Sequence, residues 1–265
     1  MQIRSMITRY GCLVALALLL VAAGCAVAPY TGRSQLMLVS PQQELALGNQ
    51  AAEQVLQKER VVRAGPQVEE VKAIGRRIAT VTGRQDFDWQ FFVVDDSETV
   101  NAFALPGGKV FVYTGLLQAA RSRDEVAAVI AHEIGHVLAR HGGERVSNVL
   151  AAQMGQQAAM AALGDMSPTA TQAANVAFGL GAQYGYILPF SRKQEYEADY
   201  IGLITMAQAG YDPRAAVSFW QTMMQRGKAK PSEYLSTHPS DQNRIAELQR
   251  FMPEAMQYYY RAGGR

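Results

Sequence analysis

Apolar residues recur at helical spacing along most of this chain, and one shorter stretch is rich in aromatic and β-branched residues. A helix is predicted over residues 41–62, because Ser40 provides an N-cap and a proline occupies the first helical position. A second helix is predicted over residues 66–82. Residues 89–94 and 110–113 predict strands.

The rest of the chain has a helical pattern. The sequence Ser122-Arg123-Asp124-Glu125 is a capping box, and the helix that it opens carries apolar residues through Ala139 before Gly142-Gly143 ends it. Further helices are predicted over residues 191–210 and 212–226 and from about residue 240. Helices on both sides of a few strands, with a turn at Pro106-Gly107-Gly108, indicate a mostly helical α+β fold with a small sheet or hairpin.

Residues 147–190 contain a single charge, Asp165, among many Ala, Gly, Gln and Met residues. The stretch has too little Leu, Ile or Val for a membrane span. One interpretation is a mobile cover over a cleft or a membrane-touching flap, because soft apolar side chains suit gating and promiscuous contact. The alternative is ordinary packed helices around a loop.

The first 24 residues are predicted to be an export signal. Arg4 and Arg9 precede an apolar stretch that is shorter than the roughly 20 residues of a membrane-spanning helix. The sequence Ala22-Ala23-Gly24-Cys25 resembles a bacterial lipobox, so Cys25 is expected to be lipidated and to anchor the chain. Ala26 follows, which by resemblance to Gram-negative lipoproteins predicts an outer-membrane lipoprotein facing the periplasm. The alternatives are an ordinary cleaved signal peptide or an uncleaved anchor.

Composition narrows the function classes. Removing the signal takes away two of the 25 basic residues and leaves 23 against 23 acidic ones. It also removes Cys12, one of the two cysteines, so no disulfide is expected. Nucleic-acid binding is not expected, because the chain has neither a basic run nor an aromatic-plus-Arg repeat. Residues 25–39 are expected to form a tether, residues 40–255 one domain, and residues 256–265 a flexible tail.

His132-Glu133-Ile134-Gly135-His136 is an HExxH motif inside a predicted helix. Residues four apart lie on one helix face, so both imidazoles can bind one ion with Glu133 beside them. A catalytic zinc ion takes three protein ligands and activates a water molecule, whose proton a carboxylate accepts. Residues 126–130 are apolar, which indicates a buried helix whose histidines need a partner. The motif therefore predicts one zinc ion per chain, with Glu133 as general base.

The third zinc ligand must come from elsewhere. If the helix continues, His141 lies about half a turn from the metal-binding face, so it is predicted to sit at the helix C-terminus. Glu144 lies past the predicted helix end. Glu195 and Asp199 are four apart on a later helix, so one can bind the ion while the other hydrogen-bonds a ligating histidine. For Glu195 the alternative is an exposed helix charge, and Glu197 points to another face and is expected to be solvated.

Four motifs occur in order along residues 40–250, and together they resemble the gluzincin family of HtpX, BepA and the CAAX prenyl proteases. They are Asn101–Gly108, His132–His136, Glu195–Asp199, and Thr237-His238-Pro239 followed by Arg244. The resemblance implies a zincin-like metallopeptidase domain. It also implies that His132, His136 and Glu195 bind zinc, that Glu133 is catalytic, and that Asp199 supports a ligand. We expect a short, lipid-anchored member, because long membrane-spanning helices and a C-terminal repeat domain are not apparent in the sequence.

Two further parts of the site are predicted. The residues Asn101, Ala102, Phe103 and Ala104 are expected on an edge strand beside the metal, where free backbone groups can pair with an extended peptide. The alternative is a plain hairpin. His238 is expected near the zinc, where it either occupies the open position and keeps the enzyme latent or, with Arg244, donates to the oxyanion. A surface histidine is the alternative.

We therefore expect a zinc-dependent endopeptidase that acts on unfolded or misassembled cell-envelope proteins. Its expected partners are polypeptide substrates, the membrane through lipidated Cys25, and outer-membrane assembly machinery. One alternative is a latent protease that acts mainly as a chaperone or assembly factor, and another is an amidase of small peptides or cell wall. A purely structural zinc site has no use for Glu133, which favours the enzyme.

Overall fold

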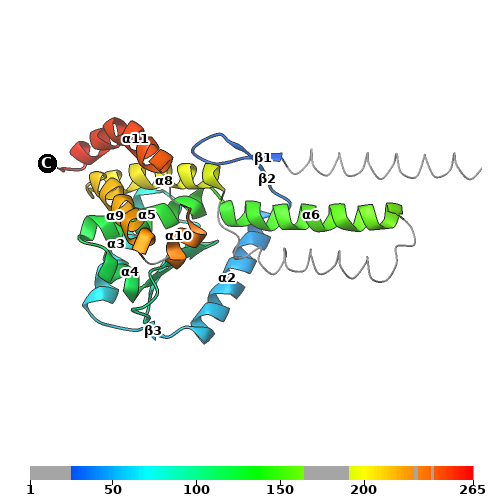
Figure 1. Cartoon of the computed structure of the whole chain (residues 1–265), viewed down its shortest axis with the longest axis horizontal. Helices are drawn as coiled ribbons and strands as arrows, with labels where there is room; N and C mark the ends of the chain where they lie inside the picture. The colour runs from blue at the N-terminus through cyan, green and yellow to red at the C-terminus, as the bar shows by residue number, and fades with distance from the viewer. Residues whose placement is uncertain (1–24, 164–190, 230–231, 240–241, 265) are drawn as a thin grey trace, which may run out of the picture. The chain divides into compact units, whose positions relative to one another are not determined.

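The computed structural model describes residues 25–163, 191–229, 232–239 and 242–264. The described residues fall into two compact units, of which the larger contains residues 41–142 and 191–264 (Figure 1). The predicted export signal lies outside the described residues, as does the part of the predicted cover beyond residue 163.

A four-stranded sheet forms one layer of the larger unit. Its strands are β3 (Val61–Val62), β4 (Gln90–Val94), β5 (Ala102–Leu105) and β6 (Lys109–Tyr113), in the order β3-β4-β6-β5. The β4–β6 pair is parallel, and the two outer pairs are antiparallel. The turn from β5 to β6 has the Gly108 N–H donating to the Leu105 carbonyl at 3.2 Å, and Gly107 at a φ of 84° that suits glycine. The predicted hairpin is confirmed.

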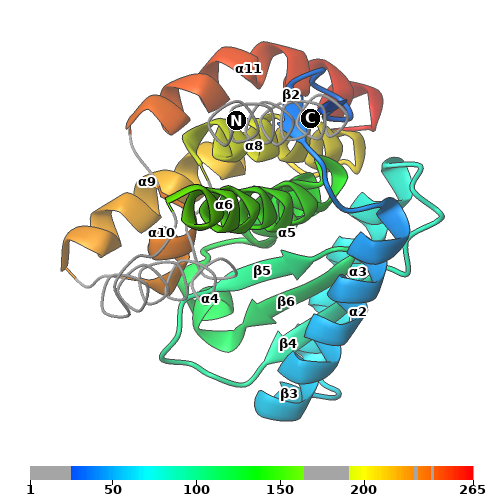
Figure 2. The same ribbon diagram turned by 90° about the vertical axis from the view of Figure 1, so that its right-hand side faces the viewer.

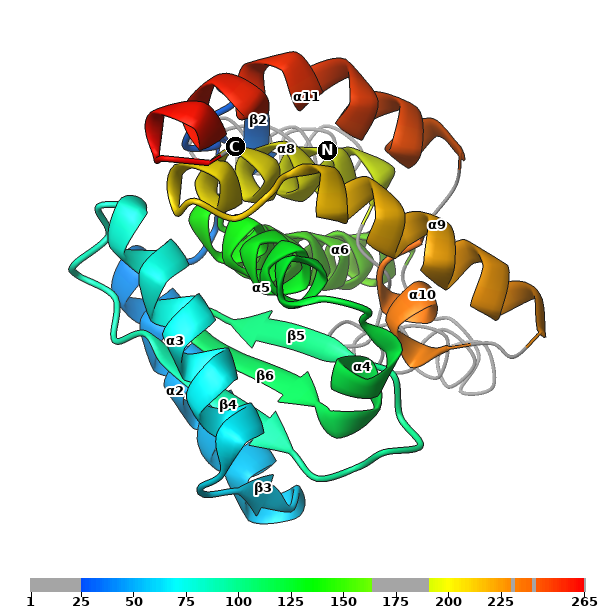
Figure 3. The same ribbon diagram turned by 90° about the vertical axis from the view of Figure 1, so that its left-hand side faces the viewer.

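Both faces of this sheet are covered by helices. Val112 faces the main core, which the sheet shares with α3 (Pro66–Val81) and α5 (Arg123–Leu138). Its neighbour Phe111 points to the other face, which packs against α2 (Pro41–Lys58). Figure 3 shows α3 and α2 on opposite sides of the sheet. The alternation of side chains along the strands therefore places α5 on one face only.

α5 is the central helix of the larger unit. All its residues from Glu125 to Leu138 are buried, and its first turn is capped by Ser122, whose Oγ accepts the Glu125 N–H at 3.2 Å. α8 (Arg192–Gln208) and α9 (Arg214–Ala229) pack against α5, and α11 (Gln242–Arg261) packs on α8 (Figure 2). The arrangement confirms an α+β fold with a small sheet beside the HExxH helix.

The structure departs from the predicted elements in several places. The first predicted helix ends at Lys58 rather than near residue 62, because β3 pairs with β4 there. The short helices α4 (Thr114–Ala119) and α10 (Glu233–Thr237) were not predicted. The last helix continues to Arg261, past the expected domain end at residue 255. Among the described helices, none has the length and apolar character needed to cross a bilayer.

The smaller unit combines a hairpin with most of α6 (His141–Leu163). Strands β1 (Cys25–Val27) and β2 (Ser34–Leu36) are antiparallel, so the span expected to be a tether contains a hairpin that starts at the exposed Cys25. The Arg33 guanidinium donates two hydrogen bonds of 2.7 Å to the Glu144 carboxylate. Glu144 lies past the end of α5, as predicted, and belongs to the first turn of α6.

Candidate metal centre

α5 and α8 approach closely because each helix presents a glycine to the backbone of the other. A Cβ atom at Gly135 would lie 2.6 Å from the carbonyl oxygen of Ala198, and one at Gly202 would lie 2.9 Å from the backbone nitrogen of His132. Such distances are too short for a side chain, so glycine permits the approach. The close packing brings the carboxylates of α8 within reach of the imidazoles of α5.

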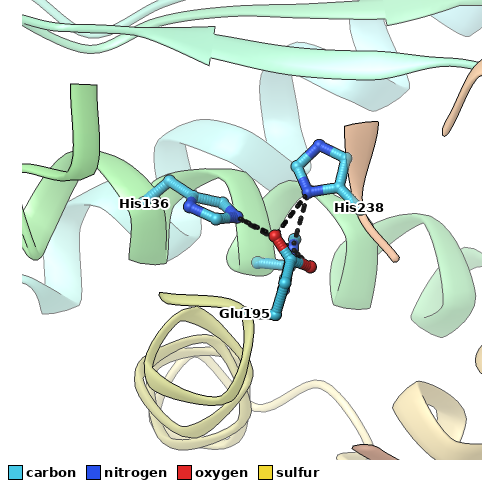
Figure 4. Close-up of side chains that lie close together, drawn as sticks. His136, Glu195 and His238 are labelled. Carbon is cyan, nitrogen blue, oxygen red and sulfur yellow. Dashed lines mark hydrogen bonds and ion pairs between the residues drawn. The ribbon is translucent and has the colours of Figure 1, made fainter. Parts of the chain in front are cut away.

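Four donor atoms converge where these helices meet. They belong to His132, His136, Glu195 and His238, all of them buried, and lie within 4.8 Å of one another. Nε2 of His132 is 3.1 Å from Nε2 of His136 and 3.2 Å from Nδ1 of His238. Oε1 of Glu195 is 3.4 Å from Nε2 of His136 and 3.2 Å from Nδ1 of His238. Figure 4 shows His136, Glu195 and His238 pointing toward one another from three separate segments.

The spacing of these donors fits a zinc ion. Four ligands at about 2.0–2.1 Å from a tetrahedral centre are about 3.3 Å apart. The separations of His132 from the other three side chains, and of His136 from Glu195, are 3.1–3.4 Å when the nearer Glu195 oxygen is taken. Imidazole nitrogens with one carboxylate oxygen are ligands that zinc accepts. The structure thus brings together the three residues predicted to hold zinc, and His238 adds a fourth donor.

Asp199 and Arg244 support this cluster from behind. Oδ1 of Asp199 lies 2.8 Å from Nδ1 of His132, where it can accept the Nδ1–H and direct Nε2 to the ion. The buried guanidinium of Arg244 donates to both Asp199 oxygens at 2.7 and 2.8 Å and pairs with Oε2 of Glu195 at 2.6 Å. It also lies 3.7 Å from the centroid of the Trp220 ring. In this structure the Arg244 guanidinium holds the carboxylates of Asp199 and Glu195, and its role at the oxyanion stays a prediction.

The pKa values show how the metal-free site is charged. Burial lowers the pKa of His132, but the Asp199 and Glu195 carboxylates outweigh it and raise the pKa to about 9. Burial lowers the pKa of His136 well below its usual value. For Glu195, burial disfavours the charge, but Arg244 outweighs it and holds the pKa well below the usual range. Zinc therefore meets an ionised carboxylate, a neutral His136, and a His132 that must release a proton.

Glu133 lies beside the cluster of donors. Its Oε1 accepts a hydrogen bond of 3.2 Å from the hydroxyl of Tyr234 and lies 3.5 Å from Nε2 of His238. Burial raises the pKa of Glu133, and burial together with the Glu133 charge keeps the Tyr234 hydroxyl protonated by raising its pKa. Sequence reasoning missed Tyr234 because α10 is so short. The available signal was Ser232, whose Oγ caps α10 by accepting the Leu235 N–H at 3.2 Å.

His141 and Glu197 lie where the sequence interpretation did not place them. α5 ends at Leu138, and Arg140 adopts a φ of 60° before α6 begins. This turn returns His141 to the core, where its Nδ1 is 2.8 Å from Nδ1 of His136. Glu197 is also buried rather than solvated, with Oε2 at 2.9 Å from Nε2 of His141. The spacing argument failed because it continued the helix through residue 141.

The predicted substrate strand lies beside the metal helix. β5 packs against α5 and ends the strand order, with β6 as its ladder partner among the described strands. Asn101 comes immediately before β5 and is buried, and its Oδ1 has no hydrogen-bond partner among the described residues. The ring of Phe103 stacks on Phe111 at 5.0 Å between centroids, as the plain-hairpin interpretation also requires. Substrate binding by Ala102, Ala104 and their neighbours stays a prediction.

Comparison with known proteins agrees with this geometry. Residues 66–252 match the model of Peptidase family M48. The mitochondrial metalloendopeptidase OMA1 of Schizosaccharomyces pombe is 43% identical over 189 residues, which cover 70% of this chain and 53% of that protein. OMA1 of Saccharomyces cerevisiae is 32% identical over 252 residues, covering 88% and 70%. The β-barrel assembly-enhancing protease of Escherichia coli is 29% identical over 232 residues, covering 83% and 46%.

The chain spans about half the length of several of the relatives that it matches. The predicted gluzincin resemblance is confirmed at the level of the family. The HtpX or BepA branch is not singled out, since OMA1 proteins match with higher identity than the E. coli protease. The chain belongs to peptidase family M48.

Proposed function

We propose that this protein is a zinc-dependent endopeptidase in which Glu133 is the general base. The observation that carries the proposal is a buried Glu133 carboxylate, held by Tyr234, beside a zinc-sized cluster of donors. A zinc ion bound there would polarise a peptide carbonyl and lower the pKa of a water molecule to about 7. Glu133 then accepts the proton of the attacking water and delivers it to the leaving amine.

The test separates metal binding from chemistry. Glu133→Gln is expected to keep zinc but to lose nearly all hydrolysis of an unfolded protein such as casein, because the ligands remain and the proton acceptor is gone. His132→Ala and Glu195→Ala are expected to lose zinc as well. The measurements are the zinc content of each purified variant and its hydrolytic activity with and without a chelator. A zinc-free or fully active Glu133→Gln protein would contradict the proposal.

We also propose that His238 keeps the enzyme latent. Its Nδ1 completes a four-donor set with His132, His136 and Glu195, whereas a catalytic zinc ion needs an open position. His238 must then leave the ion for substrate to react. His238→Ala is therefore expected to raise basal proteolysis, because it frees the position on the metal that the side chain blocks. A lower turnover with unchanged zinc content would instead assign His238 to stabilisation of the oxyanion.

Substrates are proposed to bind in extended form along β5. The strand lies beside α5, and its far edge has no ladder partner among the described strands. Backbone pairing of this kind accepts many sequences, which suits unfolded polypeptides. A non-cleavable extended peptide should inhibit casein hydrolysis competitively, raising the apparent KM for casein and leaving kcat unchanged. Strong inhibition by folded proteins but not by such peptides would exclude this mode.

We propose cell-envelope proteins as the substrate class and the outer membrane as the location. The E. coli relative is named for β-barrel assembly, which supports this substrate class, whereas the OMA1 relatives are named as mitochondrial. The location rests on residues 1–25 alone. Cys25→Ser should release the protein from membranes or leave its signal uncleaved, as fractionation and mass spectrometry of the N-terminus would show. An unmodified mature N-terminus at another residue would refute lipidation.

The alternative is a chaperone or assembly factor whose proteolysis is minor. Expression of Glu133→Gln in cells that lack the protein discriminates between the two. Full rescue by the inactive variant would favour the chaperone, and no rescue would favour the peptidase. Because this variant is expected to hold its substrates without cleaving them, identification of the captured proteins also names the substrates.

A further inference from the structure

The two zinc-binding imidazoles of α5 are each contacted on the ring nitrogen that faces away from the donor cluster. For His132, that contact is the Asp199 carboxylate. For His136, it is the imidazole of His141, whose other nitrogen lies 2.9 Å from Glu197. The HExxH motif does not include His141 or Glu197, and the proposed reaction assigns neither residue a role.

Zinc binding fixes the direction of the hydrogen bonds in this chain. A neutral imidazole carries one N–H, so His136 must hold its proton on Nδ1 when Nε2 faces the ion. That N–H donates to Nδ1 of His141 across 2.8 Å. His141 must then carry its own proton on Nε2, and this N–H donates to the Glu197 carboxylate. Each donor in the chain meets an acceptor, and each tautomer is determined.

The backbone is arranged to place His141 at this point. Arg140 is not glycine, yet it adopts a φ of 60° in the left-handed region that side chains disfavour. Its Nε donates to Oε2 of Glu44 on α2 at 2.8 Å, which holds the turn. His141 is fully buried and Glu197 is 5% exposed, so their hydrogen bonds lie away from water, where they are stronger.

We propose that His141 and Glu197 are positioning residues that set the tautomer and orientation of the zinc ligand His136. The proposal rests on the proposed function, which assigns His136 as a ligand. Through the neutral His141 ring, the Glu197 charge makes Nε2 of His136 a better electron donor to the ion. The site then has two supports of the same kind, an aspartate on His132 and a histidine with a glutamate on His136.

The experiment measures zinc affinity rather than activity. His141→Leu removes the acceptor for His136 and should lower zinc affinity about 10- to 100-fold, by competition for Zn²⁺ with a chromophoric chelator. His141→Asn places an amide oxygen near the position of Nδ1, and it should recover most of that loss. Glu197→Leu should weaken zinc binding, whereas Glu197→Gln keeps an acceptor and should stay within a few-fold of the unsubstituted protein.

Controls separate positioning from packing. Glu144→Gln removes a buried carboxylate paired with Arg33 and should leave zinc affinity unchanged. Thermal unfolding in chelator reports metal-free stability, and the visible spectrum of the Co²⁺-substituted protein reports ligand geometry. A folded His141→Leu or Glu197→Leu protein with zinc affinity within twofold and an unchanged Co²⁺ spectrum would overturn the positioning role of these two residues. Failure of the unsubstituted protein to bind zinc would overturn the proposed function instead.

Discussion

Substitution of Gly135 by alanine tests how much the zinc site depends on the close approach of α5 and α8. Gly135 lies inside the HExxH motif but provides no ligand. Its role is to let α8 pack closely against α5, because a Cβ atom there would lie 2.6 Å from the carbonyl oxygen of Ala198. Ala198 is flanked in sequence by Glu197 and Asp199. Any retreat of α8 at this point therefore moves Asp199, which contacts His132, and Glu197, which contacts His141.

Helix propensity and steric overlap have opposite effects on the free energy of unfolding of Gly135→Ala. Alanine favours a helix interior over glycine by about 0.8–1.0 kcal/mol. Relief of the contact requires a local separation of about 0.6 Å, and overpacking of this kind costs about 1–3 kcal/mol. The metal-free protein should thus lose only about 0–2 kcal/mol of stability. Zinc affinity should fall more clearly, by at least about tenfold, because ligand distances tolerate errors of only about 0.2 Å.

The assay is zinc competition with a chelator, together with thermal unfolding of the metal-free protein. Gly227→Ala on α9 is a matched control, because the atoms nearest to its added Cβ belong to the flexible Leu235 side chain. It should raise stability slightly or leave it unchanged, with normal zinc affinity. If Gly135→Ala binds zinc as tightly as the unsubstituted protein and melts at a higher temperature, the close approach is not what places the ligands.

Three further changes test other parts of the site. Tyr234→Phe removes the hydroxyl on Glu133 and should slow hydrolysis roughly 10- to 100-fold at unchanged zinc content, since hydrogen bonds to charged groups contribute about 1.5–3 kcal/mol. Arg244→Lys should destabilise the protein by about 3 kcal/mol or more in thermal unfolding, because one ammonium cannot replace a fork that pairs with two buried carboxylates. Zinc binding near pH 7 should release about one proton from His132, measured by calorimetry in buffers of different ionisation enthalpy.

The sequence was informative wherever helical period alone decides which way a side chain points. His132 and His136 are four residues apart, and so are Glu195 and Asp199, so each pair shares a helix face whatever surrounds it. The β5–β6 turn was predictable for a similar local reason, because Pro106-Gly107 suits one turn type. The histidine pair and the carboxylate pair occur in the structure at positions that this reasoning implies.

The parts that escaped prediction depend on the path of the backbone between elements. No residue preference indicates that Arg140 turns with a φ of 60°, and without that turn His141 would face away from the site. Glu197 does lie on a different side of α8 from Glu195, but the turn that carries His141 covers that side as well. Arg244 was expected at the site, yet its contacts with two carboxylates follow only from where α11 packs.

The electrostatics of the metal-free site explain why a proton and zinc compete for one nitrogen. The pKa of His132 is raised from 6.5 to about 9, so the protonated form contributes stability below pH 6.5 that is lost as pH rises through 9. A shift of this size corresponds to about 3 kcal/mol. The proton on His132 thus supplies part of the positive charge that Glu195 and Asp199 require, and zinc supplies it instead once that proton has left. Stabilisation by zinc should therefore increase over the pH range in which the metal-free protein becomes less stable.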